Sequence, residues 1–138
     1  MKLLQGLILL ITIFYFSNSY AHGTIKVYGV EHEEGYIDIK IYSDDESFLN
    51  EKQAIESIRK KPTKGLTTVP LSIIHEGEMA IVVYHDENND NKLNTGLFWR
   101  PKEGYAFSND YSPKGPPKFK KAAISLIHGE PVNILLNY

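Results

Sequence analysis

Strict alternation of β-branched and polar residues in Tyr36–Tyr42 constrains the fold of this chain more than any other feature. Ile37, Ile39 and Ile41 occupy every second position, and a period of two places them on one face of a half-buried strand. An acidic turn containing a glycine separates this run from a similar one at Thr24–Val30. The two runs therefore predict a β-hairpin near the start of the folded part of the chain.

Further strand signals follow the hairpin. Leu66–Ile74, Ala122–His128 and Val132–Tyr138 are short apolar runs bounded by turn residues, and Glu78–His85 is almost continuously apolar, as in a central strand covered on both faces. Asp44–Lys61 has apolar residues near helical spacing and predicts a short helix or helical loop. Together these patterns predict an all-β fold, an immunoglobulin-like or transthyretin-like β-sandwich of six to seven strands with at most one short helix.

The first 21 residues have the pattern of a secretory signal peptide. Lys2 supplies positive charge, Leu7–Phe16 is apolar except for one threonine, and Ser19-Tyr20-Ala21 offers small residues at the cleavage positions. The apolar run is about half of the roughly 20 residues that a membrane span needs. We therefore expect cleavage after Ala21 and a single domain at residues 22–138, with no membrane span after cleavage and a periplasmic or secreted location.

Composition limits the kind of partner. The chain has no cysteine, so the exported domain must be held by core packing rather than by disulfides. The formal charge is −2 and the basic residues are scattered, which argues against nucleic acid and against a polybasic membrane patch. We expect an extracytoplasmic partner, which is a glycan, a peptide or a protein.

One loop has the spacing of a calcium site. Asp86, Asn88, Asp90 and Asn94 offer side-chain oxygens, and Lys92 occupies the position that donates a main-chain carbonyl. The sixth position lacks the usual glycine and the twelfth lacks the usual bidentate glutamate. These five residues form the candidate calcium loop, with calcium as the candidate cofactor.

The same loop has a simpler interpretation. Asn and Asp side chains stabilise turns by bonding to nearby backbone N–H groups, so the segment can turn the chain without an ion. Two neighbouring acids, Glu87 and Glu103, offer replacements for the missing glutamate, but the spacing assigns neither of them. Both interpretations stay open at this point.

Two alternative chemistries are considered beside calcium. Cleavage after Ala21 makes His22 the first residue, and its amino group and imidazole, with His85 or His75 as a second ligand, form a candidate copper site. A hydrolase of unrecognised type is the other alternative, with His85-Asp86 and Ser108 as its only candidates. Adjacent strand residues point to opposite faces and no nucleophile elbow is present, so we expect a protein that is not an enzyme.

The aromatic residues of the long irregular segment allow two interpretations. Phe98, Trp99, Tyr105 and Tyr111 are the candidate binding patch for a glycan or a peptide. Alternatively, they bury large apolar areas and pack the segment back onto the sandwich. Packing is the favoured interpretation, because buried aromatic residues are commoner than exposed binding clusters.

A resemblance covers nearly all of residues 22–138. The stretch His85-Asp86-Glu87-Asn88, then Lys92-Leu93-Asn94, then Pro101–Asn109, Gly115–Phe119 and the closing strand resembles the bacterial family known as domain of unknown function 2141. That family usually has Asp where this chain has Asn94, and Leu97–Arg100 is bulkier than its usual lead-in. The resemblance implies a secreted β-sandwich and no established activity. The resulting hypothesis is an exported binding or structural module of unknown ligand with a candidate calcium loop.

Overall fold

The computed structural model describes residues 23–72 and 76–138. The predicted signal peptide, the cleavage site and two of the candidate copper ligands, His22 and His75, lie outside these residues.

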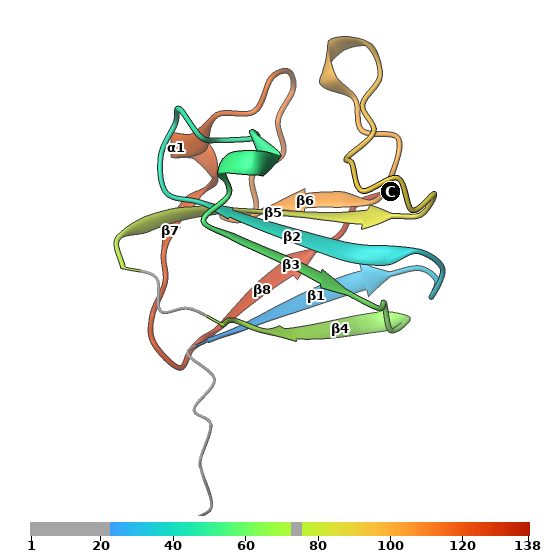
Figure 1. Cartoon of the computed structure of the whole chain (residues 1–138), viewed down its shortest axis with the longest axis horizontal. Coiled ribbons are helices and arrows are strands. Elements are labelled where there is room, and N and C mark those ends of the chain that lie inside the picture. Colours follow the sequence, from blue (N-terminus) through green and yellow to red (C-terminus); the bar gives the residue numbers. More distant parts are fainter. Residues whose placement is uncertain (1–22, 73–75) are drawn as a thin grey trace, which may run out of the picture.

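The strands form two sheets that face each other (Figure 1). In the smaller sheet, β1 lies between an antiparallel neighbour, β4, and a parallel neighbour, β8. In the larger sheet the order is β3-β2-β5-β6, all antiparallel, and β7 also pairs with β5. The strands are β1 Thr24–Val30, β2 Tyr36–Tyr42, β3 Glu56–Lys60, β4 Gly65–Pro70, β5 Glu78–Asp86, β6 Tyr105–Phe107, β7 Ala123–Ser125 and β8 Pro131–Leu135.

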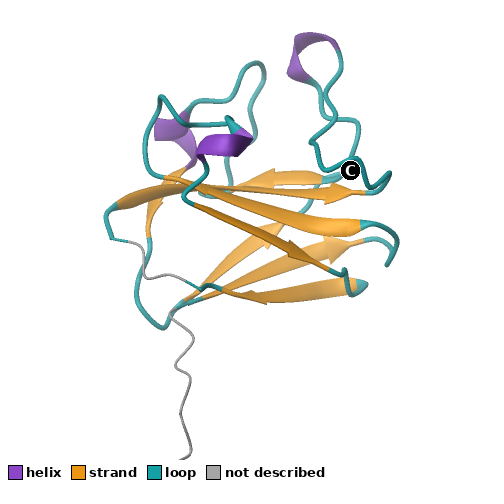
Figure 2. Cartoon of the chain, in the orientation of Figure 1, coloured by secondary structure: helices purple, strands orange, loops and turns teal. Residues whose placement is uncertain are grey.

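This arrangement confirms the predicted mostly-β sandwich, with eight strands in the described part of the chain where six to seven were expected. Within residues 23–72 and 76–138, helical structure is limited to α1 (Phe119–Ala122) and two 3₁₀ turns, η1 (Glu51–Gln53) and η2 (Leu97–Trp99). The helical turns lie outside the space between the two sheets, on the side of the larger sheet (Figure 2). They therefore cover or extend from the outer face of that sheet.

The helix expected within Asp44–Lys61 is wrong over its second half. Only η1 is helical there, and β3 follows it. Ile58 pairs with Ile39 across the antiparallel ladder, so its burial comes from period-two alternation beside β2. Tertiary pairing has overridden a weak helical pattern, as it routinely does for short segments.

The core lies between the sheets. Ile37, Ile39 and Ile41 of β2 are fully buried, and they pack with inward-facing residues of the other strands, which include Ile25, Val27, Val69, Ile81, Val83 and Ile134. Burying one such side chain contributes about 1.5–3 kcal/mol. The alternation seen in the sequence therefore selects which face of β2 meets the smaller sheet.

Strand β5 is buried on both faces, as its continuous apolar run predicts. Its second face carries Ala80 and Val82, which pack with Tyr42, Phe107 and Phe119 in a separate outer cluster. Helix α1 contributes Phe119 to this cluster. The outer face of the larger sheet is thus apolar at one end, and its other end holds the polar groups described next.

Candidate functional site

The loop between β5 and β6 is the main irregular feature near that polar end. It leaves the sheet after Asp86, projects beyond it with η2 near its tip, and returns at Glu103 (Figure 1). Its stem is closed by hydrogen bonds from Gly96 N to Arg100 O (2.6 Å) and from Lys102 N to Asn94 O (2.8 Å). The stem holds both ends of the loop close together.

Asp86 is used within the first turn of this loop. Its carboxylate accepts hydrogen bonds from the backbone N–H groups of Asp90 (3.0 Å) and Asn91 (2.8 Å). It also forms a 2.7 Å ion pair with Arg59 Nη2, and it is fully buried. Three donors therefore hold Asp86, so it shapes the turn in the way expected of an Asx-type cap.

The other predicted loop residues form a second group of contacts. Asn88 Oδ1 accepts from Asp90 N (3.1 Å), and Asp90 Oδ1 accepts from Lys92 N (2.9 Å). Asn94 Nδ2 donates to Asp90 Oδ2 (2.9 Å) and to Glu103 Oε2 (3.2 Å). The hydrogen bond from Asn94 lowers the pKa of Asp90 below its usual value. Carboxylates from the two ends of the loop thus meet at the amide of Asn94.

Glu103 is the residue whose role the sequence spacing did not assign. It is 8% exposed, and Oε2 also accepts from Asn94 N at 3.2 Å. Its other oxygen, Oε1, is buried without a hydrogen-bond partner among the described residues. A buried polar atom without a partner costs about 1–3 kcal/mol. This orphaned oxygen lies on a carboxylate that already faces the loop residues.

Below the loop, the outer face of β2, β3 and β5 carries a charged network. Arg59 bridges Asp38 (2.8 Å) and Asp86 (2.7 Å), and it also donates to Asn89 Oδ1 at 2.6 Å. Burial raises the pKa of Asp38 to about 6, although Arg59 acts in the opposite direction. Arg59 therefore neutralises part of the negative charge at the base of the loop. Farther along, the charge of Lys92 contributes to the lowered pKa of Asp90.

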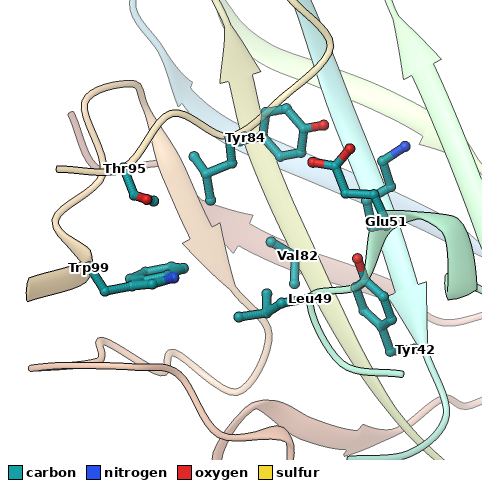
Figure 3. Close-up of a pocket in the computed structure, with 9 residues that line it drawn as sticks. Tyr42, Leu49, Glu51, Val82, Tyr84, Thr95 and Trp99 are labelled. Atoms are coloured by element: carbon teal, nitrogen blue, oxygen red, sulfur yellow. The ribbon is translucent and has the colours of Figure 1, made fainter. Parts of the chain in front are cut away.

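A pocket of about 130 Å³ lies between the loop and the outer face of the larger sheet. Val82 and Tyr84 of β5 line its floor, and Thr95 and Trp99 approach it from the loop (Figure 3). The opposite wall comes from the turn before η1 and from β2. Burial raises the pKa of Tyr42, on this wall, to about 12, so its hydroxyl stays protonated. The remaining lining residues are Lys40, Leu49, Glu51 and Leu93.

The four residues of the candidate aromatic patch take different positions. Trp99, Tyr105 and Tyr111 lie 5.6–6.1 Å from the Phe107 ring, measured between ring centroids, and pack against the outer cluster. Phe98 is 87% exposed at the loop tip. Only Trp99 of the four lines the pocket.

Of the residues considered for copper and for hydrolysis, the described ones, His85, Asp86 and Ser108, do not line this pocket. His85 is fully buried and contacts His32, with 4.6 Å between ring centroids. The hydroxyl of Ser108 is buried, donates to Ala122 O (2.5 Å) and accepts from Ile81 N (2.8 Å). Ser108 therefore serves the packing of β5 against α1.

The fold and this loop define a class: an all-β sandwich with an acidic, amide-rich loop beside a small pocket on its outer face. The chain belongs to the bacterial family described as "Uncharacterized protein conserved in bacteria (DUF2141)", which matches residues 25–134. No curated protein and no solved structure matches it. Within the described residues, no helix has the length and apolar character to cross a membrane.

Sequence reasoning missed three parts of this region. It did not assign Glu103, did not associate His32 with His85, and did not find the pocket. The two histidines meet because β2 pairs with β5, which places the turn before β2 across the end of β5. The two apolar runs are visible in the sequence, but the register in which they pair must be known before His32 can be placed beside His85.

Proposed function

We propose that this protein is an exported calcium-binding module in which the loop between Asp86 and Glu103 holds the ion and thereby fixes one wall of a small-ligand pocket. The observation that carries the proposal is the buried, unpartnered Oε1 of Glu103, on a carboxylate that shares the amide of Asn94 with Asp90. Buried charged oxygens ordinarily find a partner, and a cation is the partner that suits two carboxylates.

The ligand set that we propose differs from the set expected from spacing alone. Asp90 and Glu103 supply carboxylate oxygens, and a half-turn of the Asn94 amide exchanges its nitrogen for its oxygen. Asn88 adds a fourth side-chain oxygen, while Asp86 remains in its turn with Arg59. Calcium takes six to eight oxygen ligands in flexible geometry, including water. An all-oxygen set with two carboxylates therefore favours calcium over a transition metal.

The ion and the pocket are linked through three consecutive residues. Asn94 faces the two carboxylates, while its neighbours Leu93 and Thr95 line the pocket. An ion that fixes Asn94 would therefore fix this wall. The indole face of Trp99, two tyrosine hydroxyls and the opposite charges of Lys40 and Glu51 suit a small molecule with a flat apolar face and polar edges. A sugar unit of a glycan has this character.

Calorimetric titration with calcium, together with melting curves, tests the ion site. We expect saturable binding to the purified protein and a rise in melting temperature. Glu103→Gln should weaken binding at least tenfold, because Gln keeps the shape and loses the charge. Glu130→Gln, at an exposed position in the turn before β8, is the matched control and should bind as the unchanged protein does. Absence of heat and of any melting shift at millimolar calcium would refute the proposal.

Fluorescence tests the link to the pocket. Trp99 is the single tryptophan of the chain and lines the pocket, so its emission reports this wall without labelling. We expect calcium to reduce quenching by acrylamide in the unchanged protein and to leave it unaltered in Glu103→Gln. Equal quenching with and without bound calcium would mean that the ion does not order the wall.

A further inference from the structure

A second group of metal-ligating side chains lies at the same end of the sandwich, outside the loop just described. It consists of His32 in the β1–β2 turn, His85 in β5 and Glu87 immediately after β5. One ligand atom from each lies within 4.8 Å of the other two. The grouping follows from the register, because Ile37 pairs with His85 and the turn before β2 therefore lies over the end of β5.

Gly35 makes this approach possible. Its φ is +66°, and a Cβ at this position would overlap the backbone of Asp86 and Glu87. The turn and the end of β5 are therefore in direct backbone contact, which brings His32 over His85.

The hydrogen bonds of His85 prepare one of its nitrogens for a metal. Nε2 lies 2.6 Å from the carbonyl oxygen of Glu34, and a carbonyl only accepts, so Nε2 carries the proton. The lone pair is then on Nδ1. A histidine that donates one N–H to a backbone carbonyl while its other nitrogen holds a metal is the usual arrangement in metal sites.

One ring nitrogen of His32 makes no hydrogen bond to the described part of the chain. Nε2 lies 3.3 Å from Glu87 Oε2, whereas Nδ1 is buried and has no hydrogen-bond partner among the described residues. Both side chains of this pair are about one third exposed, at 35% and 36%. The group is therefore open to an ion from solvent on one side and ordered by the buried His85 on the other.

We propose that His32, His85 and Glu87 bind a borderline divalent transition ion, with Zn²⁺ as the ion that the ligand set fits. Two imidazoles and one carboxylate are a known zinc set that leaves the fourth tetrahedral position open. Imidazole nitrogen also separates this site from the all-oxygen calcium site. The two sites share no ligand, so either one can fail without the other.

Tyr138 acts as a competitor for the ion. Its hydroxyl lies 2.6 Å from His85 Nδ1, the nitrogen that carries the lone pair, and it also accepts from Glu31 N at 3.3 Å. The hydroxyl must leave Nδ1 before an ion binds there. Tyr138 follows the last strand and is 47% exposed, so its ring can move without disturbing the core.

Zinc calorimetry and the visible spectrum of bound Co²⁺ test the site. All measurements use a His22→Ala background, which removes the candidate ligand at the amino end. We expect one Zn²⁺ per chain and the intense visible bands of four-coordinate Co²⁺. His32→Gln and Glu87→Gln should each weaken zinc binding at least tenfold. His128→Gln, at an exposed position in the turn before β8, is the matched control. Unaltered zinc affinity in His32→Gln would overturn the proposal.

Two further variants keep the test independent of folding and of calcium. Tyr138→Phe removes the competing hydrogen bond and should tighten zinc binding roughly fivefold, the equivalent of one ordinary hydrogen bond. Unchanged or weaker binding would overturn the competitor role. Glu103→Gln should leave zinc affinity unchanged, and a loss there would overturn the separation of the two sites.

Discussion

Replacement of Asn94 by Asp is the sharpest perturbation of the proposed calcium loop. The Asn94 amide nitrogen lies 2.9 Å from Asp90 Oδ2 and 3.2 Å from Glu103 Oε2, so it is a donor between two acceptors. Asp keeps the size of the side chain and replaces the donor by a third carboxylate.

The loss of folding stability in this variant is estimated from the contact between residue 94 and Glu103, because Glu103 is the more buried of the two acids. A hydrogen bond to a charged group contributes about 1.5–3 kcal/mol. Two like charges about 4 Å apart repel by about 1 kcal/mol in water and about 4 kcal/mol near a protein surface. Because the loop is partly exposed, we take the lower ends of both ranges. Without calcium the variant should lose about 2–3 kcal/mol, which is roughly 8–12 °C in melting temperature for a domain of this size.

Calcium should reduce this loss of stability. A third carboxylate adds an anionic ligand to the site, so calcium affinity should rise at least tenfold. At saturating calcium, a tenfold higher affinity stabilises the variant by about 1.4 kcal/mol more than the unchanged protein, which offsets about half of the loss. Melting curves in EDTA and in millimolar calcium, with calorimetric titration, measure both effects. Asn133→Asp, on the exposed side of β8, is the matched control and should respond equally in the two buffers.

Equal destabilisation of the Asn94→Asp variant in EDTA and in calcium would refute an ion beside Asn94. Such a result would mean that the two carboxylates and the amide form a turn that needs no ion. A variant that binds calcium no more tightly than the unchanged protein would lead to the same conclusion.

Three other predictions concern residues that stabilise the strands and the turn around the site. The folded pKa of Asp38, about 6, exceeds the usual 3.8, so the folded state binds more protons and loses up to about 3 kcal/mol of stability as the pH rises from about 4 to 6. Asp38→Asn should abolish this fall in stability. Urea unfolding at several pH values measures the effect, and an unchanged dependence of stability on pH in the variant would contradict the prediction. Gly35→Ala combines a positive φ with a backbone overlap and should cost at least about 2 kcal/mol, which thermal unfolding measures against Gly129→Ala, a glycine with positive φ and open space around its Cβ position. Ser108→Ala leaves a buried N–H of β5 without its acceptor and should cost about 1–3 kcal/mol in denaturant unfolding, while a neutral result would show that the strand relaxes around the loss.

Some features of the fold follow from local sequence, because they depend on periodicity. The three isoleucines of β2 specify a buried face at every second residue, and the continuous apolar run of β5 specifies a strand covered on both sides. The sandwich and its central strand were predicted from these patterns alone. The segment after Asp44 shows the limit, because Ile58 becomes partly buried by pairing with β2 and no local pattern describes that neighbour.

The candidate site also has features that the sequence predicts and contacts that only the fold creates. The Asp and Asn spacing of the loop is visible in the sequence, and so is the turn that such residues favour. Glu103 joins Asn94 only because the loop folds back on itself to re-enter the sheet, and His32 joins His85 and Glu87 only because the β1–β2 turn crosses the end of β5. The sequence determined which oxygens and nitrogens were available to bind an ion. The tertiary structure decided which of them meet, because strand register and chain return are set by packing between distant segments.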